Sequence, residues 1–276
     1  MLPEYVPTVV GQAILPVLKG PTTLLSLPIA QLGEVPLAEV WPADTGMLMA
    51  AMSCDAADAQ QAAACVNDRL IEFVRNEGFP HLVRVWNHIE DINREVDGLE
   101  RYRAFCAGRA EAFERHGYAM RGDLPASSGV GMDGPGVAAY CIASRVPAMS
   151  VENPRQVSAY DYPRRYGPRS PSFSRAAVIN GVVFVSGTAS IVGHETRHAG
   201  DVVLQLSETM LNLEVVLAAA RARELAAAKV YLRRAEDYGF VAARLRTAWP
   251  RTQMLFLRAD LCRADLLVEI EGVAVT

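Results

Sequence analysis

The strongest constraint on the fold is a hairpin signal in the second half of the chain. Asn180-Gly181 joins two short apolar segments that together span residues 175–187. Asparagine and glycine both accept the left-handed backbone that a two-residue hairpin turn requires, and the apolar residues on either side favour extended strands. The sequence therefore predicts a β-hairpin over residues 176–186.

Helical periodicity predicts the elements that follow this hairpin. Apolar residues recur at helical spacing from Val202 to Leu217, and Asp201 directly before them is a favourable N-cap residue. This helix is expected to run to residue 222, and a second helix is predicted over residues 237–249 because Pro250 follows it. Strands are predicted over residues 229–233, 254–259 and 266–275. The order is strand, strand, helix, strand, helix, strand, strand.

The first half of the chain repeats this order more faintly. Its patterns predict strands over residues 46–52, 81–89 and 136–144 and helices over residues 55–77 and 98–116. We therefore expect an α+β fold of two pseudo-duplicated halves, each a small sheet with helices on one face, with the two sheets associating edge to edge. Residues 9–17 and 22–27 show a weaker pattern that is compatible with two more strands.

A segment rich in proline, tyrosine and arginine separates the two halves. It covers residues 150–174, and its aromatic and cationic content is unusual for a passive linker. We expect an ordered connecting loop between an N-terminal half over residues 1–149 and a C-terminal half over residues 175–276, which is expected to carry the active site.

Charge and hydropathy exclude several classes of partner. The 276 residues carry a formal net charge of -4, and the pI near 5.8 gives no basic surface of the kind that nucleic-acid-binding proteins use. Apolar runs such as residues 215–220 are far shorter than a membrane span of roughly 20 residues. The N-terminus lacks the basic and apolar regions of a secretory signal. We expect a cytoplasmic protein without a nucleic-acid or membrane partner.

The sequence predicts neither a metal nor another cofactor. Its five cysteines show no CxxC or CxxH spacing, which argues against a disulfide framework and a thiolate zinc site. His194 and His198 precede Asp201, but two such imidazoles need a helix to align on one ion. Gly193 and Gly200 indicate a loop there instead. Neither a dinucleotide-binding glycine motif nor a P-loop occurs.

Several strings of residues occur in the order in which the chorismatases have them. They are Pro80–Ile89, Gly98–Arg109, Tyr162–Ala176, Phe184–His194, Lys229–Asp237 and Cys262–Glu271. The chain resembles the chorismatase family from roughly residue 40 to its end. The C-terminal half alone is similar to the RidA/YjgF-like (chorismate-mutase-like) fold, which has a comparable Val-Phe-Val-Ser-Gly and a terminal Val-Glu-Ile-Glu. A chorismatase resembles two such units fused in one chain, and the resemblance implies a monomer or at most a loosely associated assembly.

Glu269 is the residue expected to start the chemistry. Cleavage of an enol ether begins with protonation of its methylene carbon, a poor base, so a positioned carboxylic acid is needed. Strand alternation puts Glu269 on the same face as Leu267 and Glu271 in an apolar segment. Burial there would raise its pKa and keep it protonated near neutral pH. The alternative is a strand-end carboxylate held in a salt bridge.

Chorismate carries two carboxylates, so its pocket needs cations, a task suited to the planar guanidinium group. Arg251, after the stop of the second helix, resembles the carboxylate-binding arginine of the RidA fold and is the first candidate. Arg175, Arg169 and Arg244 are further candidates. The alternative for each is a solvated or paired arginine at the surface.

The resemblance also implies roles for three smaller features. Tyr160, Tyr162 and Tyr166 offer hydroxyl groups and ring walls, of which Tyr160 is the predicted ligand, unless these rings only pack the connector. Family members with cysteine at the position of Cys262 tend to rearrange chorismate internally, whereas the alternative is a buried apolar cysteine. Ala189 is expected to influence whether water reaches the substrate cation.

The resemblance implies conversion of chorismate to 3-hydroxybenzoate and pyruvate, by protonation of the enolpyruvyl ether and intramolecular rearrangement. Two alternatives stay open. In one, water captures the cation and gives 3,4-dihydroxycyclohexa-1,5-dienoate and pyruvate. In the other, motivated by the C-terminal half alone, the chain is a RidA-like imine deaminase or ligand-binding module.

Overall fold

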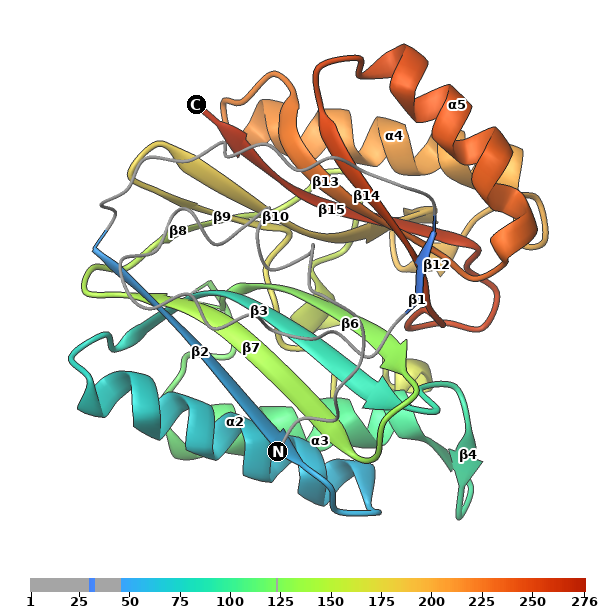
Figure 1. Ribbon diagram of the computed structural model, residues 1–276. Coiled ribbons are helices and arrows are strands. Elements are labelled where there is room, and N and C mark those ends of the chain that lie inside the picture. Colours follow the sequence, from blue (N-terminus) through green and yellow to red (C-terminus); the bar gives the residue numbers. More distant parts are fainter. Residues whose placement is uncertain (1–29, 33–45, 123) are drawn as a thin grey trace.

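Figure 1 shows the computed structural model, which describes residues 30–32, 46–122 and 124–276. The weak strand patterns at residues 9–17 and 22–27 lie outside this part of the chain. The described residues form two main sheets, each with its helices on the outer side (Figure 1).

The first sheet is built from the N-terminal unit, residues 46–144. Its elements are β2 (Met47–Cys54), α2 (Ala59–Asn76), β3 (His81–Glu90), α3 (Arg101–Arg115), β6 (Ala126–Met132) and β7 (Val137–Ser144). The strands lie in the order β2-β7-β3-β6. Only β3 and β6 run parallel, and the other neighbours are antiparallel.

The second sheet is built mainly from the C-terminal unit, residues 175–276. Its elements are β9 (Ala176–Ile179), β10 (Val182–Ala189), α4 (Val202–Ala219), β13 (Leu225–Leu232), α5 (Tyr238–Ala248), β14 (Gln253–Arg258) and β15 (Val268–Val275). The predicted hairpin is β9-β10, with Asn180 and Gly181 at φ 50° and 78°. Asp201 caps α4 as predicted, because its side chain accepts a hydrogen bond from the backbone of Leu204.

Short strands complete the second sheet at its edges. β1 (Ala30–Leu32) pairs with β14, and β8 (Met149–Val151) pairs with β9. The full order is β1-β14-β13-β15-β10-β9-β8. Two small hairpins lie outside the main sheets, β4 (Glu95–Val96) with β5 (Leu99–Glu100), and β11 (Ile191–Val192) with β12 (Glu195–Thr196).

The two units have the same topology. The sheet order β10-β15-β13-β14 in the C-terminal unit corresponds to β2-β7-β3-β6 in the N-terminal unit. The parallel pair β13-β14 corresponds to β3-β6, and both middle pairs are antiparallel. The prediction of an α+β fold with two pseudo-duplicated halves is therefore confirmed.

The sheets meet through their faces, so the expectation of edge-to-edge association was wrong for most of the contact. Trp86 and Val83 of β3 share one core cluster with Phe184 of β10 and Tyr231 of β13. Edge contacts are isolated bridges, for example between Ala126 and Ser174. The outer face of each sheet is apolar and is covered by the helices of the same unit. The inner face of each sheet is also apolar, and it is buried because the two inner faces pack on each other.

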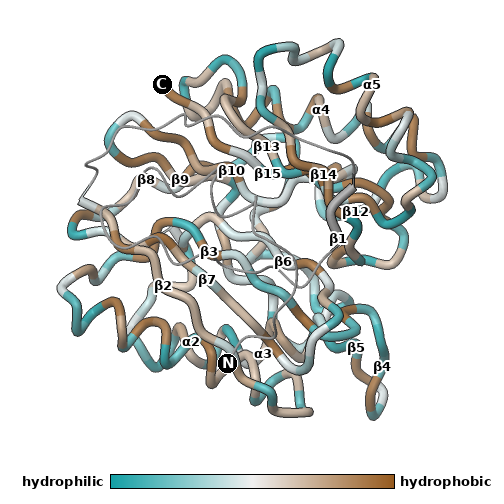
Figure 2. The backbone as a smooth tube through the Cα atoms, viewed as in Figure 1, coloured by the Kyte–Doolittle hydropathy of each residue, from teal (hydrophilic) through white to brown (hydrophobic). Residues whose placement is uncertain are grey.

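Hydropathy follows this layering. Figure 2 shows apolar stretches along the strands of the second sheet and more hydrophilic residues in the loops around it. In the described part of the chain, α4 is the one helix that is long and apolar enough to span a membrane, and 44% of it is buried inside the protein. Its buried residues, including Leu206, Leu213 and Leu217, pack in the apolar core cluster between this helix and the sheet, as expected of a core helix.

Candidate active site

Glu269 lies in the middle of the second sheet, on the face that meets the first sheet. On β15 it pairs with Ala189 of β10 on one side and with Tyr231 of β13 on the other. Val268 and Ile270 belong to the core under the helices, so alternation turns Glu269 and Glu271 to the inner face. The two carboxyl groups belong to residues that are only 3% and 1% exposed.

A β-bulge in β10 makes room for the Glu269 carboxyl group. The register between β10 and β15 shifts between Val185 and Thr188, which places Gly187 in the irregular segment. A Cβ atom at Gly187 would lie 2.0 Å from Oε1 of Glu269. Glycine is therefore required at this position by the close approach of a side chain.

A cavity of about 560 Å³ opens beside this carboxyl group. The C-terminal unit and the connector supply most of its wall, and α3 and the segment before it supply part from the N-terminal unit. Its wall includes Glu100, Tyr102, Arg103, Tyr162, Arg165, Tyr166, Phe173, Arg175, Gly187, Ala189, Glu195, Cys262, Arg263 and Glu269. The volume is within the range of small-molecule sites.

Burial keeps Glu269 protonated at neutral pH. Removal from water raises its pKa to about 8, and the negative charge of Glu271 acts in the same direction, against weaker opposing effects that include Arg84 and Arg175. Cys262 lies with Sγ 3.9 Å from Oε2 of Glu269. The pKa of Cys262 is also raised, mainly by burial and secondly by the negative charge that Glu269 carries when it is ionised. Cys262 is therefore a neutral thiol.

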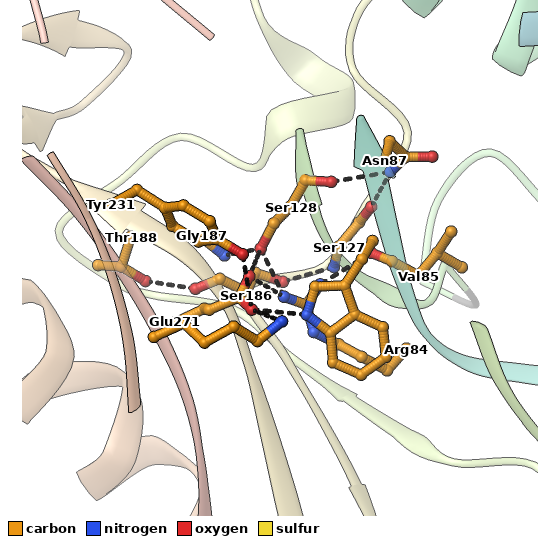
Figure 3. Close-up of polar contacts among 12 residues, drawn as sticks. Arg84, Val85, Asn87, Ser127, Ser128, Ser186, Gly187, Thr188, Tyr231 and Glu271 are labelled. Carbon is orange, nitrogen blue, oxygen red and sulfur yellow. Dashed lines mark hydrogen bonds and ion pairs between the residues drawn. The ribbon is translucent and has the colours of Figure 1, made fainter. Parts of the chain in front are cut away.

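Glu271 is held in the opposite ionisation state by a buried polar network (Figure 3). Lys229 Nζ lies 2.6 Å from its Oε1, and Arg84 Nη2 lies 2.7 Å from its Oε2. Trp86 Nε1 and the Tyr231 hydroxyl also donate to Oε1, at 2.6 and 3.2 Å. Burial alone would raise the pKa of Glu271, but Lys229 and Arg84 overcome this effect and lower the pKa to about 2. Two neighbouring carboxyl groups thus have different protonation states, a pattern typical of acid catalysis.

Ser128 of β6 links this network to the bulge. Its Oγ donates to Oε2 of Glu271 and accepts a hydrogen bond of 2.9 Å from the backbone N–H of Gly187 (Figure 3). Nearby, the backbone N–H of Ser127 donates to Oγ of Ser186 at 2.7 Å. The N-terminal unit therefore fixes the backbone on which the Glu269 carboxyl group rests.

Two arginines of the cavity have no carboxylate partner within the described ranges, 30–32, 46–122 and 124–276. Arg175 is 5% exposed, and its Nη2 donates to the Tyr162 hydroxyl at 2.9 Å, while its Nε has no hydrogen-bond partner among these residues. The guanidinium of Arg263 lies 4.5 Å from the ring centre of Tyr166. By contrast, Arg103 and Arg165 form salt bridges with acidic residues of the cavity wall. Arg175 and Arg263 are thus the cations suited to an anionic ligand.

Four of the seven predicted site residues line this cavity. They are Glu269, Cys262, Arg175 and Ala189. The cavity wall does not include Arg251, Tyr160 or Arg244.

Arg251 lies at the end of the sheet opposite to Glu269. It precedes β14 near the start of the parallel pair β13-β14, whereas Glu269 pairs with Tyr231 near the end of β13. Its side chain is 80% exposed and forms a 2.7 Å salt bridge with Glu224. Arg244 is exposed on α5, on the outer side of the sheet.

Tyr160 packs against the core of the N-terminal unit, and Tyr162 and Tyr166 line the cavity instead. The connector makes short 3-10 turns, η2 (Ala159–Asp161) and η3 (Arg164–Tyr166), which give neighbouring tyrosines different directions. Arg169 pairs with Glu114 at the surface. No simple periodicity applies to such a segment, so the sequence did not distinguish these rings.

Arg263 and Tyr102 were not singled out by the sequence. Arg263 directly follows Cys262, and Tyr102 lies within the string Gly98–Arg109, so both stand inside the segments that carried the resemblance. His194 and His198, for which the sequence argued against a metal site, contact other groups. His194 Nδ1 lies 3.2 Å from the Tyr166 hydroxyl, and His198 Nε2 lies 3.6 Å from Glu208.

Comparison with known proteins gives consistent matches. The family described as chorismatase FkbO/Hyg5-like, N-terminal, matches residues 35–143. A Streptomyces hygroscopicus protein described as 3-hydroxybenzoate synthase is 44% identical over an alignment of 226 positions, and the match covers 74% of this chain and 66% of that protein. A chorismatase of Streptomyces rapamycinicus is 40% identical over an alignment of 230 positions, and the match covers 76% of this chain and 69% of the relative. The crystal structure of a chorismatase superposes with a TM-score of 0.76 at 34% identity, covering 88% of this chain and 80% of the other.

Proposed function

This chain belongs to the chorismatase family, and from that premise we propose that it converts chorismate to 3-hydroxybenzoate and pyruvate. The observation that carries the proposal is a protonated, buried carboxyl group, Glu269, on the wall of a cavity that also presents two arginines without carboxylate partners among the described residues. A relative with 44% identity described as 3-hydroxybenzoate synthase supports this product.

The first step assigned to Glu269 is proton transfer to the methylene carbon of the enolpyruvyl group. The new C–H bond uses the electrons of the carbon–carbon double bond, which leaves an oxocarbenium cation next to the ether oxygen. Carbon is a poor base, so the acid must be positioned and desolvated. With a pKa of about 8, Glu269 holds its proton at neutral pH, and the carboxylate that forms stabilises the cation.

Arg175 and Arg263 are assigned to the two carboxylates of chorismate. A guanidinium can bind a carboxylate through two parallel hydrogen bonds, which also fixes the orientation of the ligand. The Tyr162 hydroxyl already contacts Arg175 at 2.9 Å, and Phe173 lies under the same guanidinium at 5.1 Å. This arrangement holds Arg175 in place before the substrate arrives.

Aromatisation of the ring releases a proton, which replaces the one that Glu269 gives up in the first step. The neighbouring ring hydroxyl adds to the oxocarbenium carbon, and cleavage of one ring C–O bond and of the bond from that carbon to the other oxygen releases pyruvate with one oxygen and leaves the other oxygen on the ring. The proton of the added hydroxyl ends on the phenol oxygen. The ring then loses one hydrogen as a proton, and the Glu269 carboxylate is the base assigned to accept it, so each turnover ends with the acid restored. No water is consumed between chorismate and the products 3-hydroxybenzoate and pyruvate. Cys262 is a neutral thiol beside this carboxyl group, so its proposed part is to fill the space next to the cation and not to act as a thiolate base.

The decisive experiment is incubation of the protein with chorismate, followed by chromatography of the products and a pyruvate assay. The variant Glu269→Gln keeps the shape of the side chain but cannot donate an acidic proton, so pyruvate release is expected to fall by about 100-fold or more. Glu224→Gln is the matched control at an exposed position. Full activity of Glu269→Gln would assign the proton to another group, and absence of pyruvate from the wild type would rule out the proposed reaction.

A further inference from the structure

The Ser128 hydroxyl group lies where the N-terminal unit meets the bulge of β10 (Figure 3). Ser128 belongs to β6 and is 5% exposed. Its Oγ accepts a hydrogen bond of 2.9 Å from the backbone N–H of Gly187 and a second one from Nη2 of Arg84, and it donates to Oε2 of Glu271. A hydroxyl group donates one hydrogen bond and accepts two, so the full hydrogen-bonding capacity of Ser128 is used.

The direction of each of these hydrogen bonds is fixed. The backbone amide and the guanidinium group can only donate, so the hydrogen of the Ser128 hydroxyl must point to Glu271. Glu271 accepts it because Lys229 and Arg84 keep this carboxyl group ionised, with a pKa of about 2. The Ser128 oxygen is therefore available to the Gly187 N–H group across the whole pH range in which the protein is assayed.

The Gly187 N–H group has a second acceptor within reach, the carboxyl group of the acid. The register shift between Val185 and Thr188 takes Gly187 out of the regular ladder with β15, so its N–H is not committed to the sheet. A Cβ atom at Gly187 would lie 2.0 Å from Oε1 of Glu269. A Cβ atom lies about 2.5 Å from the nitrogen of its own residue, so Oε1 is within about 4.5 Å of the Gly187 nitrogen.

A small backbone rotation at Gly187 would turn its N–H from Ser128 to Glu269. Glycine allows such a rotation because it has no side chain, and an N–H group that loses one partner turns toward another acceptor nearby. A hydrogen bond from a backbone N–H stabilises the ionised form of a carboxyl group and lowers its pKa. An acid that must hold its proton at neutral pH is therefore better off without this donor.

We propose that Ser128 is a positioning residue for the acid: its hydroxyl group keeps the Gly187 N–H group occupied, so that the Glu269 carboxyl group receives no backbone hydrogen bond that would favour loss of its proton. The inference rests on the proposed function for its catalytic consequence. Through Ser128, the N-terminal unit contributes to the chemistry of a carboxyl group that belongs to the C-terminal unit.

The other charged and titratable groups around Glu269 stay in place when the Ser128 hydroxyl is removed. Glu271, on the same strand, keeps its contacts with Lys229, Trp86 and Tyr231 and therefore stays ionised. From the elements packed against the acid, the groups that face it are Arg84, Tyr102, Cys106, Arg109, Arg175, Tyr231, Cys262 and Arg263. Of these, Arg84 is the one with a hydrogen bond to Ser128 in the described part of the chain, and its salt bridge with Glu271 remains.

The test is the pH dependence of kcat/KM for pyruvate release in Ser128→Ala. The pH at which kcat/KM has fallen to half of its plateau is expected to be lower than in the wild type by about one unit or more, the size expected for a hydrogen bond to an ionised group. Ser144→Ala is the matched control, because Ser144 is a buried serine of the same sheet, 1% exposed, whose hydroxyl donates to the carbonyl of Val146 outside the cavity wall. Its midpoint is expected to equal that of the wild type. An unchanged or higher midpoint in Ser128→Ala would overturn the proposal.

Ser128→Cys covers the case in which Ser128→Ala does not fold. The thiol has nearly the size of the hydroxyl group but is a weak acceptor, so the midpoint is expected to move in the same direction by a smaller amount. A wild-type midpoint in a folded Ser128→Cys variant would equally overturn the proposal.

Infrared titration provides a readout that needs no substrate. The band of the protonated Glu269 carboxyl group is identified by its loss in Glu269→Gln, and it is expected to disappear at lower pH in Ser128→Ala than in the wild type. Equal midpoints of this band would overturn the role of Ser128. Failure of the proposed function gives a different result, because the wild-type protein would then release no pyruvate, while the infrared midpoints still decide the role of Ser128.

Discussion

Gly187→Ala tests whether the bulge positions the acid. The added Cβ would lie 2.0 Å from Oε1 and 2.7 Å from Cδ of Glu269, whereas real Cβ contacts essentially never fall below 3.0 Å. The nearest atoms belong to the end of a side chain, so the carboxyl group moves and the backbone stays. The required shift is at least 1.0 Å, the difference between 3.0 and 2.0 Å.

A displacement of this size is enough to disrupt proton transfer. Misplacement of a reacting group by about 1 Å costs on the order of 100-fold in rate, so kcat of Gly187→Ala is expected to fall by about that factor. The assay is initial-rate pyruvate release, with thermal unfolding followed by circular dichroism to show that the variant is folded. Gly239→Ala, which meets no described heavy atom within 4 Å, is the control and is expected to match the wild type.

Wild-type kcat in Gly187→Ala would refute this reasoning, because the carboxyl group would then act equally well from a shifted position. Loss of the folded state would refute a different part, namely that the side chain of Glu269 yields before the backbone of the bulge.

Three further predictions concern charge. The protonated form of Glu269 is the active form, and its pKa is about 8. We therefore expect kcat/KM to be constant below pH 8 and to fall about tenfold per pH unit above pH 8. A rise of kcat/KM through pH 8 would indicate that Glu269 acts as a base instead. Glu271→Gln leaves the buried charges of Lys229 and Arg84 without a counter-charge. The free energy of unfolding, measured by chemical denaturation, is therefore expected to fall by about 3 kcal/mol or more. An unchanged free energy of unfolding would contradict the stabilising role of this network. Arg175→Lys removes bidentate binding and should raise KM for chorismate about tenfold, whereas Arg251→Lys, at an 80% exposed side chain, should leave KM within about twofold; equal effects would speak against this choice of anchor.

The sequence predicted the elements whose local signals agree with their burial. The β9-β10 hairpin follows from Asn180-Gly181, and α4 follows from its N-cap and apolar spacing. β6 was missed because Ala-Ser-Ser-Gly-Val-Gly-Met contains few residues that favour strands. Its strand conformation comes from parallel pairing with β3, a tertiary contact that no local pattern reveals.

The candidate site was predictable where a regular strand carries it. Alternation along β15 was sufficient to put Glu269 and Glu271 on one face. The arginines lie in irregular segments, so their positions depend on which loops meet at the end of the sheet. Arg263 reaches the cavity, and Arg251 pairs with Glu224 at the opposite end of β13.

The network around Glu271 joins positions that are far apart in the chain. Arg84 and Trp86 are separated from Glu271 by 187 and 185 residues, and Ser128 by 143. A C-terminal fragment made by cutting the connector would keep Lys229 beside Glu271 but would lose Arg84, Trp86 and Ser128, and the inner face of its sheet, which carries the acidic pair, would lose its cover. Although both units share one topology, both contribute to the site, so we expect separately expressed fragments to be active only after they reassociate.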